Sequence, residues 1–182
     1  MATDLTIKGD VVLGGGLTAA GALIGDSAAF VNACGAAALN STGAITNPKA
    51  KITAEGGYAI KLTNKTGAAS VKGTIVAVKS DTDNAFDLVA IDGTDCIGVV
   101  YEAGVADAAE CFVVIAGKAQ VLMTNNATRG QMCRIPLNTD TGEEAGKGVA
   151  AALPAAANIG HIGTILESKN AGTLCYVALA LN

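Results

Sequence analysis

His161 is the only histidine of the 182-residue chain, so it is the first candidate for a catalytic base. It stands between Gly160 and Ile162 in an apolar stretch that is typical of a strand. Catalysis by an imidazole needs a nucleophile and an orienting carboxylate around it, and the sequence shows no nucleophile–base spacing of that kind. We therefore interpret His161 as a structural residue and expect the chain not to be an enzyme.

Three carboxylates, Glu102, Asp107 and Glu110, gather around one short turn and are the next candidates. Carboxylates at this spacing could ligate a cation or form an acid–base pair. The Asp-x-Asp-x-Asp-Gly pattern of a calcium loop does not occur here, which favours a solvated turn. A second interpretation stays open, in which Tyr101, Glu102 and Asp107 line the mouth of a small ligand-binding β-barrel.

The cysteines and glycines give no sign of a metal or cofactor site. Zinc sites need closely spaced ligand pairs, so scattered cysteines predict reduced, buried thiols and no metal. The glycine run at 14–16 lacks the Lys-Ser/Thr of a phosphate-binding loop and any β–α–β context. We therefore expect no cofactor. The five cysteines are Cys34, Cys96, Cys111, Cys133 and Cys175.

The composition narrows the class of partner. Hydrophobic residues make up 51% of the chain and charged residues only 15%, and the formal net charge is −4. An acidic chain without a basic cluster is not expected to bind nucleic acid directly. No apolar run approaches the ~18 residues of a membrane-spanning helix, and residues 1–10 do not resemble a secretion signal. Burial between protein subunits best explains the surplus of apolar residues.

The stretch 96–124 must position the turn carboxylates, and it contains three apolar runs of strand length. Residues 104–109 are too few for anything but a turn, and Gly117 permits a bend or bulge. We therefore predict a three-stranded meander at the centre of the fold. Its strands are expected at 96–101 (CIGVVY), 110–117 (ECFVVIAG) and 118–124 (KAQVLMT).

Short strands separated by turns are predicted on both sides of this centre. Tyr58, Ile60 and Leu62 alternate with polar residues, as in a half-buried strand. Residues 138–158 are expected to form a long surface loop with one helical turn at 149–153. An apolar hairpin over 159–168 and 173–182 closes the chain, and its last strand is expected inside the sheet. Strands at this spacing, without β–α alternation, predict an all-β fold, a small barrel or a sandwich.

Residues 1–54 are predicted to form an extended Gly/Ala-rich arm, followed by a β-domain over 55–182. Glycines interrupt every potential helix of the arm, and its apolar residues are spaced too irregularly to build a core. An arm that becomes ordered against neighbouring subunits explains both features, and a mobile extension is the alternative. The apolar residues expected to make these contacts are Leu17, Leu23, Ile24, Phe30, Val31, Leu39 and Ile45.

The chain resembles the head decoration, or capsid cement, proteins of tailed phages over roughly residues 55–182. Residues 55–78 (EGGYAIKLTNKTGAASVKGTIVAV) look like the first strands of such proteins. The similarity is one of turns and strand order, without an invariant catalytic motif. The residues that carry it best are 97–123 (IGVVYEAGVADAAECFVVIAGKAQVLM), 128–135 (TRGQMCRI) and 159–168 (IGHIGTILES), with the apolar strand that closes the chain.

The resemblance implies a compact, tulip-type β-domain that forms a homotrimer on the outside of an icosahedral capsid. It implies the major capsid protein as partner, contact through the N-terminal arm, and assembly in the host cytoplasm. The role of such proteins is to stabilise the mature head, and they are not enzymes. The alternative within the same class is a head-fibre or tail-associated trimer, whose N-terminal region anchors a protruding β-domain.

Overall fold

The structure, a computed structural model, describes residues 49–152 and 160–181, all within the compact unit Gly43–Asn182. The described residues form ten strands and no helix, which confirms the predicted all-β class. In these ranges no helix is long and apolar enough to span a membrane. The strands are β1 (Ala50–Ile52), β2 (Gly57–Asn64), β3 (Ile75–Val78), β4 (Ala85–Leu88), β5 (Cys96–Val100), β6 (Glu110–Leu122), β7 (Met132–Arg134), β8 (Val149–Ala151), β9 (His161–Ile165) and β10 (Leu174–Leu179).

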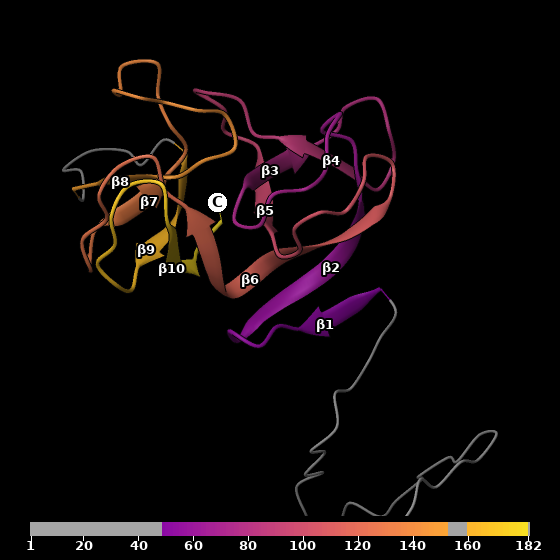
Figure 1. Cartoon of the computed structure of the whole chain (residues 1–182), viewed down its shortest axis with the longest axis horizontal. Coiled ribbons are helices and arrows are strands. Elements are labelled where there is room, and N and C mark those ends of the chain that lie inside the picture. The colour runs from indigo at the N-terminus through magenta and orange to yellow at the C-terminus, as the bar shows by residue number, and fades with distance from the viewer. Residues whose placement is uncertain (1–48, 153–159, 182) are drawn as a thin grey trace, which may run out of the picture. The chain divides into compact units, whose positions relative to one another are not determined.

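Five of the strands close into a small mixed barrel (Figure 1). Hydrogen-bonded neighbours follow the order β2, β4, β3, β5, β6, and β6 pairs again with β2 to complete the ring. Every pairing in the ring is antiparallel except that of β2 with β4, where Thr63 aligns with Ala85. The strand predicted from the alternation at 58–62 is β2, one wall of this barrel, but the expected buried face is wrong at its start, since Tyr58 is 44% exposed and Ala59 is fully buried next to a register shift in the pairing with β6.

The remaining strands, apart from β1, form a second lobe that also starts from β6. Its order runs from β6 through β10, β9 and β7 to β8. A parallel bridge between Met123 and Gly148 joins the outer side of β8 back to the end of β6. Asn125 supports this closure, because its side chain accepts a hydrogen bond from the Ala150 amide and donates one to the Ala150 carbonyl oxygen, both at 2.8 Å. The β-domain therefore consists of two lobes that share β6.

β6 is one strand of 13 residues, which corrects the predicted three-stranded meander. Its first half pairs with β2 and β5, and its second half, from Gly117 onward, pairs with β10. Gly117 has a φ of +81°, in the left-handed region that glycine adopts most readily. A Cβ at this position would lie 2.7 Å from the carbonyl oxygen of Gly56. The predicted bend is present, but it redirects one strand instead of separating two.

The middle strands of the barrel, β3 and β5, contribute side chains to two cores. The barrel interior contains Val76, Phe86, Val100, Cys111 and Val113, each at most 2% exposed. The neighbours of Val76 on β3 point the other way, into a larger core that continues through the second lobe. Small and medium-sized aliphatic side chains fill both cores, as the composition indicates.

Two further predictions concern the C-terminal third. The closing hairpin is confirmed, since β9 and β10 pair antiparallel and β10 lies between β6 and β9 inside the sheet. The helical turn predicted at 149–153 is wrong for residues 149–151, which form β8 and pair with β7. Val149 and Ala150 are buried in the second lobe, so tertiary packing overrides the local helix preference of the alanines.

β1 is a strand that the sequence did not indicate. It lies on the N-terminal side of the expected domain boundary at residue 54 and pairs antiparallel with β2, Ile52 opposite Tyr58. β1 lies outside the barrel ring. It pairs with the beginning of β2, on the same edge of β2 where β4 pairs with the end of that strand. The described β-domain therefore includes residues from Lys49 onward.

Candidate functional site

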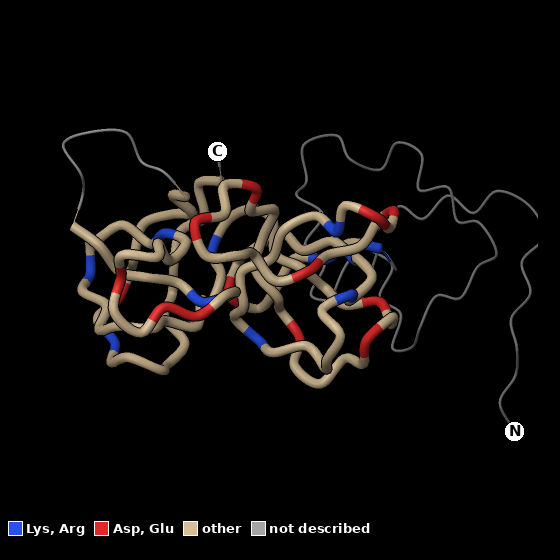
Figure 2. Tube along the Cα trace, turned by 90° about the horizontal axis from the view of Figure 1, so that it is seen from above, with Lys and Arg blue, Asp and Glu red and all other residues tan. Residues whose placement is uncertain are grey.

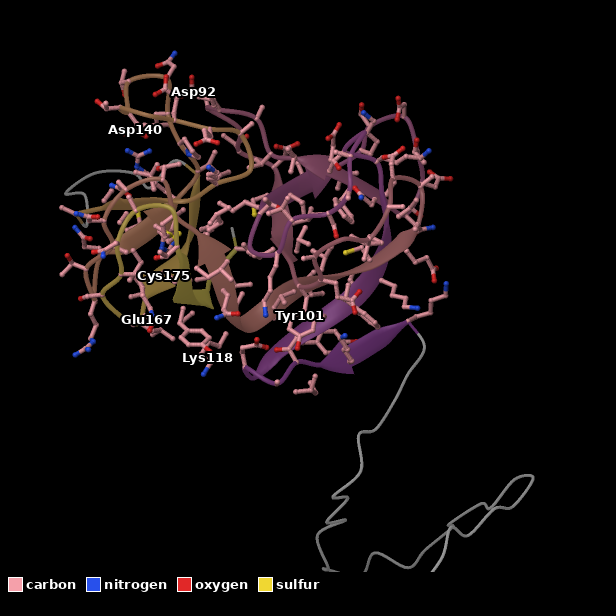
Figure 3. All side chains as sticks on the ribbon, viewed as in Figure 1. Asp92, Tyr101, Lys118, Asp140, Glu167 and Cys175 are labelled. Atoms are coloured by element: carbon pink, nitrogen blue, oxygen red, sulfur yellow. The ribbon has the colours of Figure 1, made fainter. Side chains whose placement is uncertain are left out.

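Positions of lysine and arginine are interspersed with positions of aspartate and glutamate along the described trace (Figure 2). On the outer surface of β1, β2 and β6, lysines also contact aromatic rings, among them that of Tyr101 (Figure 3). Lys51 Nζ lies 4.5 Å from the centre of the Tyr101 ring and 3.9 Å from that of Phe112. The same ammonium is 3.1 Å from Glu102 Oε1. Cation–π contacts of this kind contribute about 0.5–1 kcal/mol at exposed sites. These contacts stabilise the barrel surface, since the Lys51 ammonium faces both aromatic rings and a carboxylate.

The pattern repeats on either side of Lys51. Lys72 Nζ lies 5.0 Å from the Tyr101 ring centre and 3.1 Å from Glu55 Oε1. Burial raises the pKa of Glu55, but the hydrogen bond and charge of Lys72 outweigh it, so the pKa lies below its ordinary value. Lys61 Nζ lies 5.3 Å from the Phe112 ring centre. The surface is a continuous set of internal pairs, in which each charge has a partner in the chain.

The three carboxylates at the predicted turn do not converge. Each contacts a different partner: Glu102 pairs with Lys51, Glu110 with Lys61, and Asp107 accepts a hydrogen bond from the Gly67 amide. Nowhere in residues 49–152 or 160–181 do three or more side chains that could ligate a metal come together. The geometry therefore does not support a cation site or an acid–base pair at this turn.

Asn64, at the end of β2, is a fully buried polar residue whose role the sequence did not reveal. Its amide nitrogen donates to the carbonyl oxygens of Ala68 and Val105, at 2.8 and 3.0 Å. Its amide oxygen accepts from the backbone and hydroxyl of Thr66, at 3.1 and 2.8 Å. These bonds tie loop 65–71 to loop 101–109 and fix one rim of the barrel. An asparagine that ends an apolar strand and precedes a Lys-Thr-Gly turn is the signal that could have identified it.

Ser70 provides a second tie between the same two loops. Its hydroxyl donates to the Glu102 carbonyl oxygen at 2.6 Å and accepts from the Val105 amide at 3.0 Å. The Ser70 amide also donates to the Val105 carbonyl oxygen at 2.8 Å. The rim is therefore held by buried side-chain and backbone hydrogen bonds, which make a rigid mouth rather than a flexible lid.

A small apolar pocket of about 110 Å³ opens inside this rim. Phe86 and Val100 are buried at its base, whereas Val71 and Leu88 are 51% and 38% exposed. The residues predicted to line a ligand-binding mouth, Tyr101, Glu102 and Asp107, are not part of it. The lining consists of Thr66, Ala68, Ala69, Ser70, Val71, Thr74, Phe86, Leu88 and Val100.

A larger groove of about 580 Å³ runs along β2 next to β1. Part of its lining is apolar, from Ala50 and the Tyr58, Ile60 and Leu62 positions of β2, and the rest is charged or polar. It includes Lys49, the first described residue, so it lies next to the point where the N-terminal region joins the β-domain. The complete lining is Lys49, Ala50, Tyr58, Ile60, Lys61, Leu62, Thr63, Asn84 and Glu110.

His161 and the four cysteines of the described ranges lie within strands, at buried or half-buried positions. His161 begins β9 and is half-buried opposite Arg134 of β7. Three of the thiols are buried as predicted, and Cys96 is half-buried. Burial raises the pKa of Cys96 to about 11 and also raises the pKa of the three buried thiols, which makes all four weak nucleophiles at neutral pH. The three buried thiols are Cys111, Cys133 and Cys175.

The beginning of the predicted surface loop 138–158 is braced by carboxylates (Figure 3). Arg134 donates two hydrogen bonds to Asp140, both at 2.7 Å, and Asp140 also accepts from the Leu137 amide at 2.8 Å. Asp92 accepts from the Asn138 amide at 3.1 Å. The hydrogen bonds of Arg134 hold the pKa of Asp140 below its ordinary value. Glu143 and Glu144 lie farther along the loop, where Glu144 pairs with Lys147 at 2.7 Å.

The seven arm residues expected to contact a capsid lie outside the described residues, as do Cys34 and the glycine run at 14–16. The arm contacts therefore stay a prediction. The structure identifies two other surfaces that a partner could use, the barrel-mouth pocket and the groove next to β1.

Of the comparisons with known proteins, the one with solved structures gives matches. No protein-family model matches the chain, and no curated protein matches it. Among solved structures, the chain is similar to the crystal structure of the head fiber gp8.5 N base in bacteriophage phi29. The identity is 13%, the similarity covers 68% of this chain and 94% of that chain, and the TM-score is 0.48. A likeness of this degree assigns no function by itself.

Proposed function

We propose that the chain is a structural protein of a tailed-phage head, attached to the outside of the capsid and without catalytic activity. The proposal is carried by one observation, the position in the fold of the residues that resemble capsid decoration proteins. Residues 97–123 comprise nearly all of β5 and the whole of β6, and β6 is the strand that both lobes share. The resemblance therefore concerns the strands on which the whole β-domain is built.

The chemistry of the described surface supports a structural role. A catalytic centre needs titratable groups that are free to meet a substrate and have pKa values suited to the reaction. In the described part of the chain, Glu55, Asp87, Glu110 and Asp140 have lowered pKa values because of lysine or arginine partners. The pocket at the barrel mouth is apolar, and the four described thiols have raised pKa values. These features are consistent with a structural protein that binds other proteins and performs no catalysis.

We propose the major capsid protein as the partner and the N-terminal region as the main attachment. Burial of each apolar arm residue against a capsid would contribute about 1–2 kcal/mol. The cost of ordering the glycine-rich backbone, about 1–2 kcal/mol per residue, cancels much of this gain. Attachment of this kind is favourable only on a preformed surface, which suits addition to an assembled head.

Two placements on the head are compatible with the proposal, a decoration protein and the base of a head fibre. The similar phage structure is itself described as the base of a head fibre. Since the role implied by the resemblance is to stabilise the mature head, we expect a decoration protein to raise the temperature at which heads release their DNA, and a fibre base to attach without raising it. Thermal release of DNA from heads with and without the protein distinguishes the two placements.

Binding to purified heads tests the proposal. Heads that lack the protein are mixed with the full chain and sedimented, and bound protein is quantified. We expect saturable binding, and we expect the double variant Phe30→Ser, Val31→Ser to bind at least about tenfold more weakly. The matched control is Ala28→Ser, Ala29→Ser in the same segment, which should bind nearly as well as the unchanged chain. Absence of binding by the unchanged chain, or equal loss in both variants, would contradict the proposal.

A further inference from the structure

The two ends of the barrel differ in a way that suggests how copies of this chain meet. One end has the rigid rim and the apolar pocket, near the last residue of β2. At the other end, the β1–β2 hairpin carries Ile52 opposite Tyr58, near the first residue of β2. Ile52 is 71% exposed, the highest value among the exposed large hydrophobic residues of the described ranges. An exposed isoleucine and an unfilled apolar pocket thus coexist on one molecule.

The pocket has the size of one aliphatic side chain. Its volume is about 110 Å³, and an apolar protein cavity of about 150 Å³ holds a whole benzene molecule. The four-carbon side chain of isoleucine is smaller than benzene and fits such a space. Tyr58, which lies opposite Ile52 in the β1–β2 pairing and is 44% exposed, is the neighbouring side chain that would cover the exposed Val71 and Leu88 at the opening.

The polar groups of the pocket are already engaged, so its occupant must be apolar. The Thr66 hydroxyl donates to Asn64 Oδ1, the Ser70 hydroxyl to the Glu102 carbonyl oxygen, and the Thr74 hydroxyl to the Val71 carbonyl oxygen at 2.8 Å. None of these hydroxyl groups could donate to a polar ligand unless its present hydrogen bond were broken. An aliphatic side chain loses nothing in this environment.

A molecule cannot fill the pocket with its own Ile52. β2 has 8 residues and separates the hairpin end from the rim, which corresponds to about 20 Å at the rise of an extended strand. The contact must therefore join two copies, and it joins two different surfaces. Such a head-to-tail contact closes into a ring when the rotation between copies permits, and otherwise continues as a filament.

We infer that Ile52 of one copy inserts into the barrel-mouth pocket of a second copy, so that copies of this chain associate head to tail. The inference does not depend on the capsid attachment proposed above, because both surfaces belong to the described β-domain. It gives the expected homotrimer a specific heterologous contact, with Ile52 as the inserting residue and Val71, Leu88 and Ala68 around the opening.

The mass of the full-length chain in solution, measured by light scattering after size exclusion, is the first test. The unchanged chain should form an oligomer whose mass exceeds that of one chain. Ile52→Asp and Ala68→Phe, which fills the pocket without adding a charge, should each raise the dissociation constant roughly 10–100-fold. Leu166→Asp is the matched control, since Leu166 is 41% exposed on the second lobe, and it should leave the mass unchanged. A monomeric unchanged chain, or equal effects of Leu166→Asp and Ile52→Asp, would overturn the inference.

Mixing the two disrupted variants tests the head-to-tail geometry. Ile52→Asp retains an intact pocket and Ala68→Phe retains an intact Ile52, so an equimolar mixture should form a one-to-one heterodimer with one complete contact. A contact between identical surfaces could not be restored in this way. Circular dichroism melting of each variant establishes that it is folded, which is expected because both substituted positions are exposed. Two folded variants that stay monomeric when mixed would overturn the inference.

Discussion

Asn64 is the residue on which the shape of the barrel mouth depends most. Asn64→Ala would leave the carbonyl oxygens of Ala68 and Val105 without this donor and would detach loop 65–71 from loop 101–109. Because the site is fully buried, we expect a loss of about 2–4 kcal/mol in the free energy of unfolding. Urea denaturation followed by circular dichroism measures this loss.

Asn126→Ala is the control for this prediction. Asn126 is exposed and accepts a single hydrogen bond, from the Ala171 amide at 2.9 Å. We expect this variant to lose about 0.5 kcal/mol or less. If the two variants were equally stable, Asn64 would not organise the rim.

Asp140 makes the stability of the second lobe depend on pH. Its partner Arg134 lowers the pKa of the folded state below the ordinary value of 3.8, so the pair stabilises the folded chain above that value. This contribution is lost as the pH falls through the folded pKa. Asp140→Asn should therefore lower the free energy of unfolding by about 2 kcal/mol at pH 7 and by progressively less below pH 4.

Denaturation of the unchanged chain and of Asp140→Asn across pH 2–8 measures this difference. The control Glu144→Gln removes an ion pair whose carboxylate side chain is 60% exposed, and should change the stability by less than about 0.5 kcal/mol. A difference for Asp140→Asn that is constant from pH 7 to pH 2 would show that the charge of Asp140 is not the cause.

Among the strands, β6 connects the two lobes, and Gly117 is the point where it changes partner. Gly117→Ala combines an unfavourable φ of +81° with a Cβ 2.7 Å from the Gly56 carbonyl oxygen. We expect a loss of about 3 kcal/mol or more in the free energy of unfolding. Gly104→Ala has a similar φ of +79° but open space around the new Cβ, so it should lose only about 1 kcal/mol. Thermal denaturation of both variants compares them, and equal losses would exclude close backbone approach as the reason for glycine at 117.

The local patterns in the sequence were sufficient to predict several individual strands but not their connections. Alternation identified β2, and an apolar pair of runs around a short turn identified the β9–β10 hairpin. The continuity of β6 was not predictable, because a glycine between two apolar runs fits a turn as well as a bend. β8 was missed because the burial of Val149 and Ala150 is decided by β7, 15 or more residues away in the sequence.

The candidate surfaces were less predictable than the strands for the same physical reason. The bonds of Asn64 to Val105 join residues 41 positions apart, and the pocket draws its lining from residues between Thr66 and Val100. Asp107 and Glu110 are exposed as a solvated turn predicts, whereas Glu102 is half-buried, and the lysine partners of Glu102 and Glu110 on β1 and β2 depend on strand register. Periodicity says which face a residue occupies, and it does not say which residues meet there.

At the scale of the whole molecule, the β-domain should fold without the region before it. Residues from Lys49 onward contain every described strand, both closed lobes and both cores. We expect a chain that comprises residues 49–182 to be soluble and to unfold in one cooperative transition, measured by calorimetry. A chain of residues 55–182, which follows the boundary expected from the sequence, lacks β1 and should melt at a lower temperature. An unfolded 49–182 chain would contradict the division into an arm and a β-domain.

The central claim is that this chain is a structural component of a phage head. The most direct test is quantitative mass spectrometry of heads purified from an infected culture that expresses the chain, with the soluble fraction measured in parallel. We predict that the full chain is found in the heads at a fixed ratio to the major capsid protein, and that a chain of residues 49–182 stays in the soluble fraction. A full chain that is absent from purified heads and recovered entirely in the soluble fraction would contradict the account.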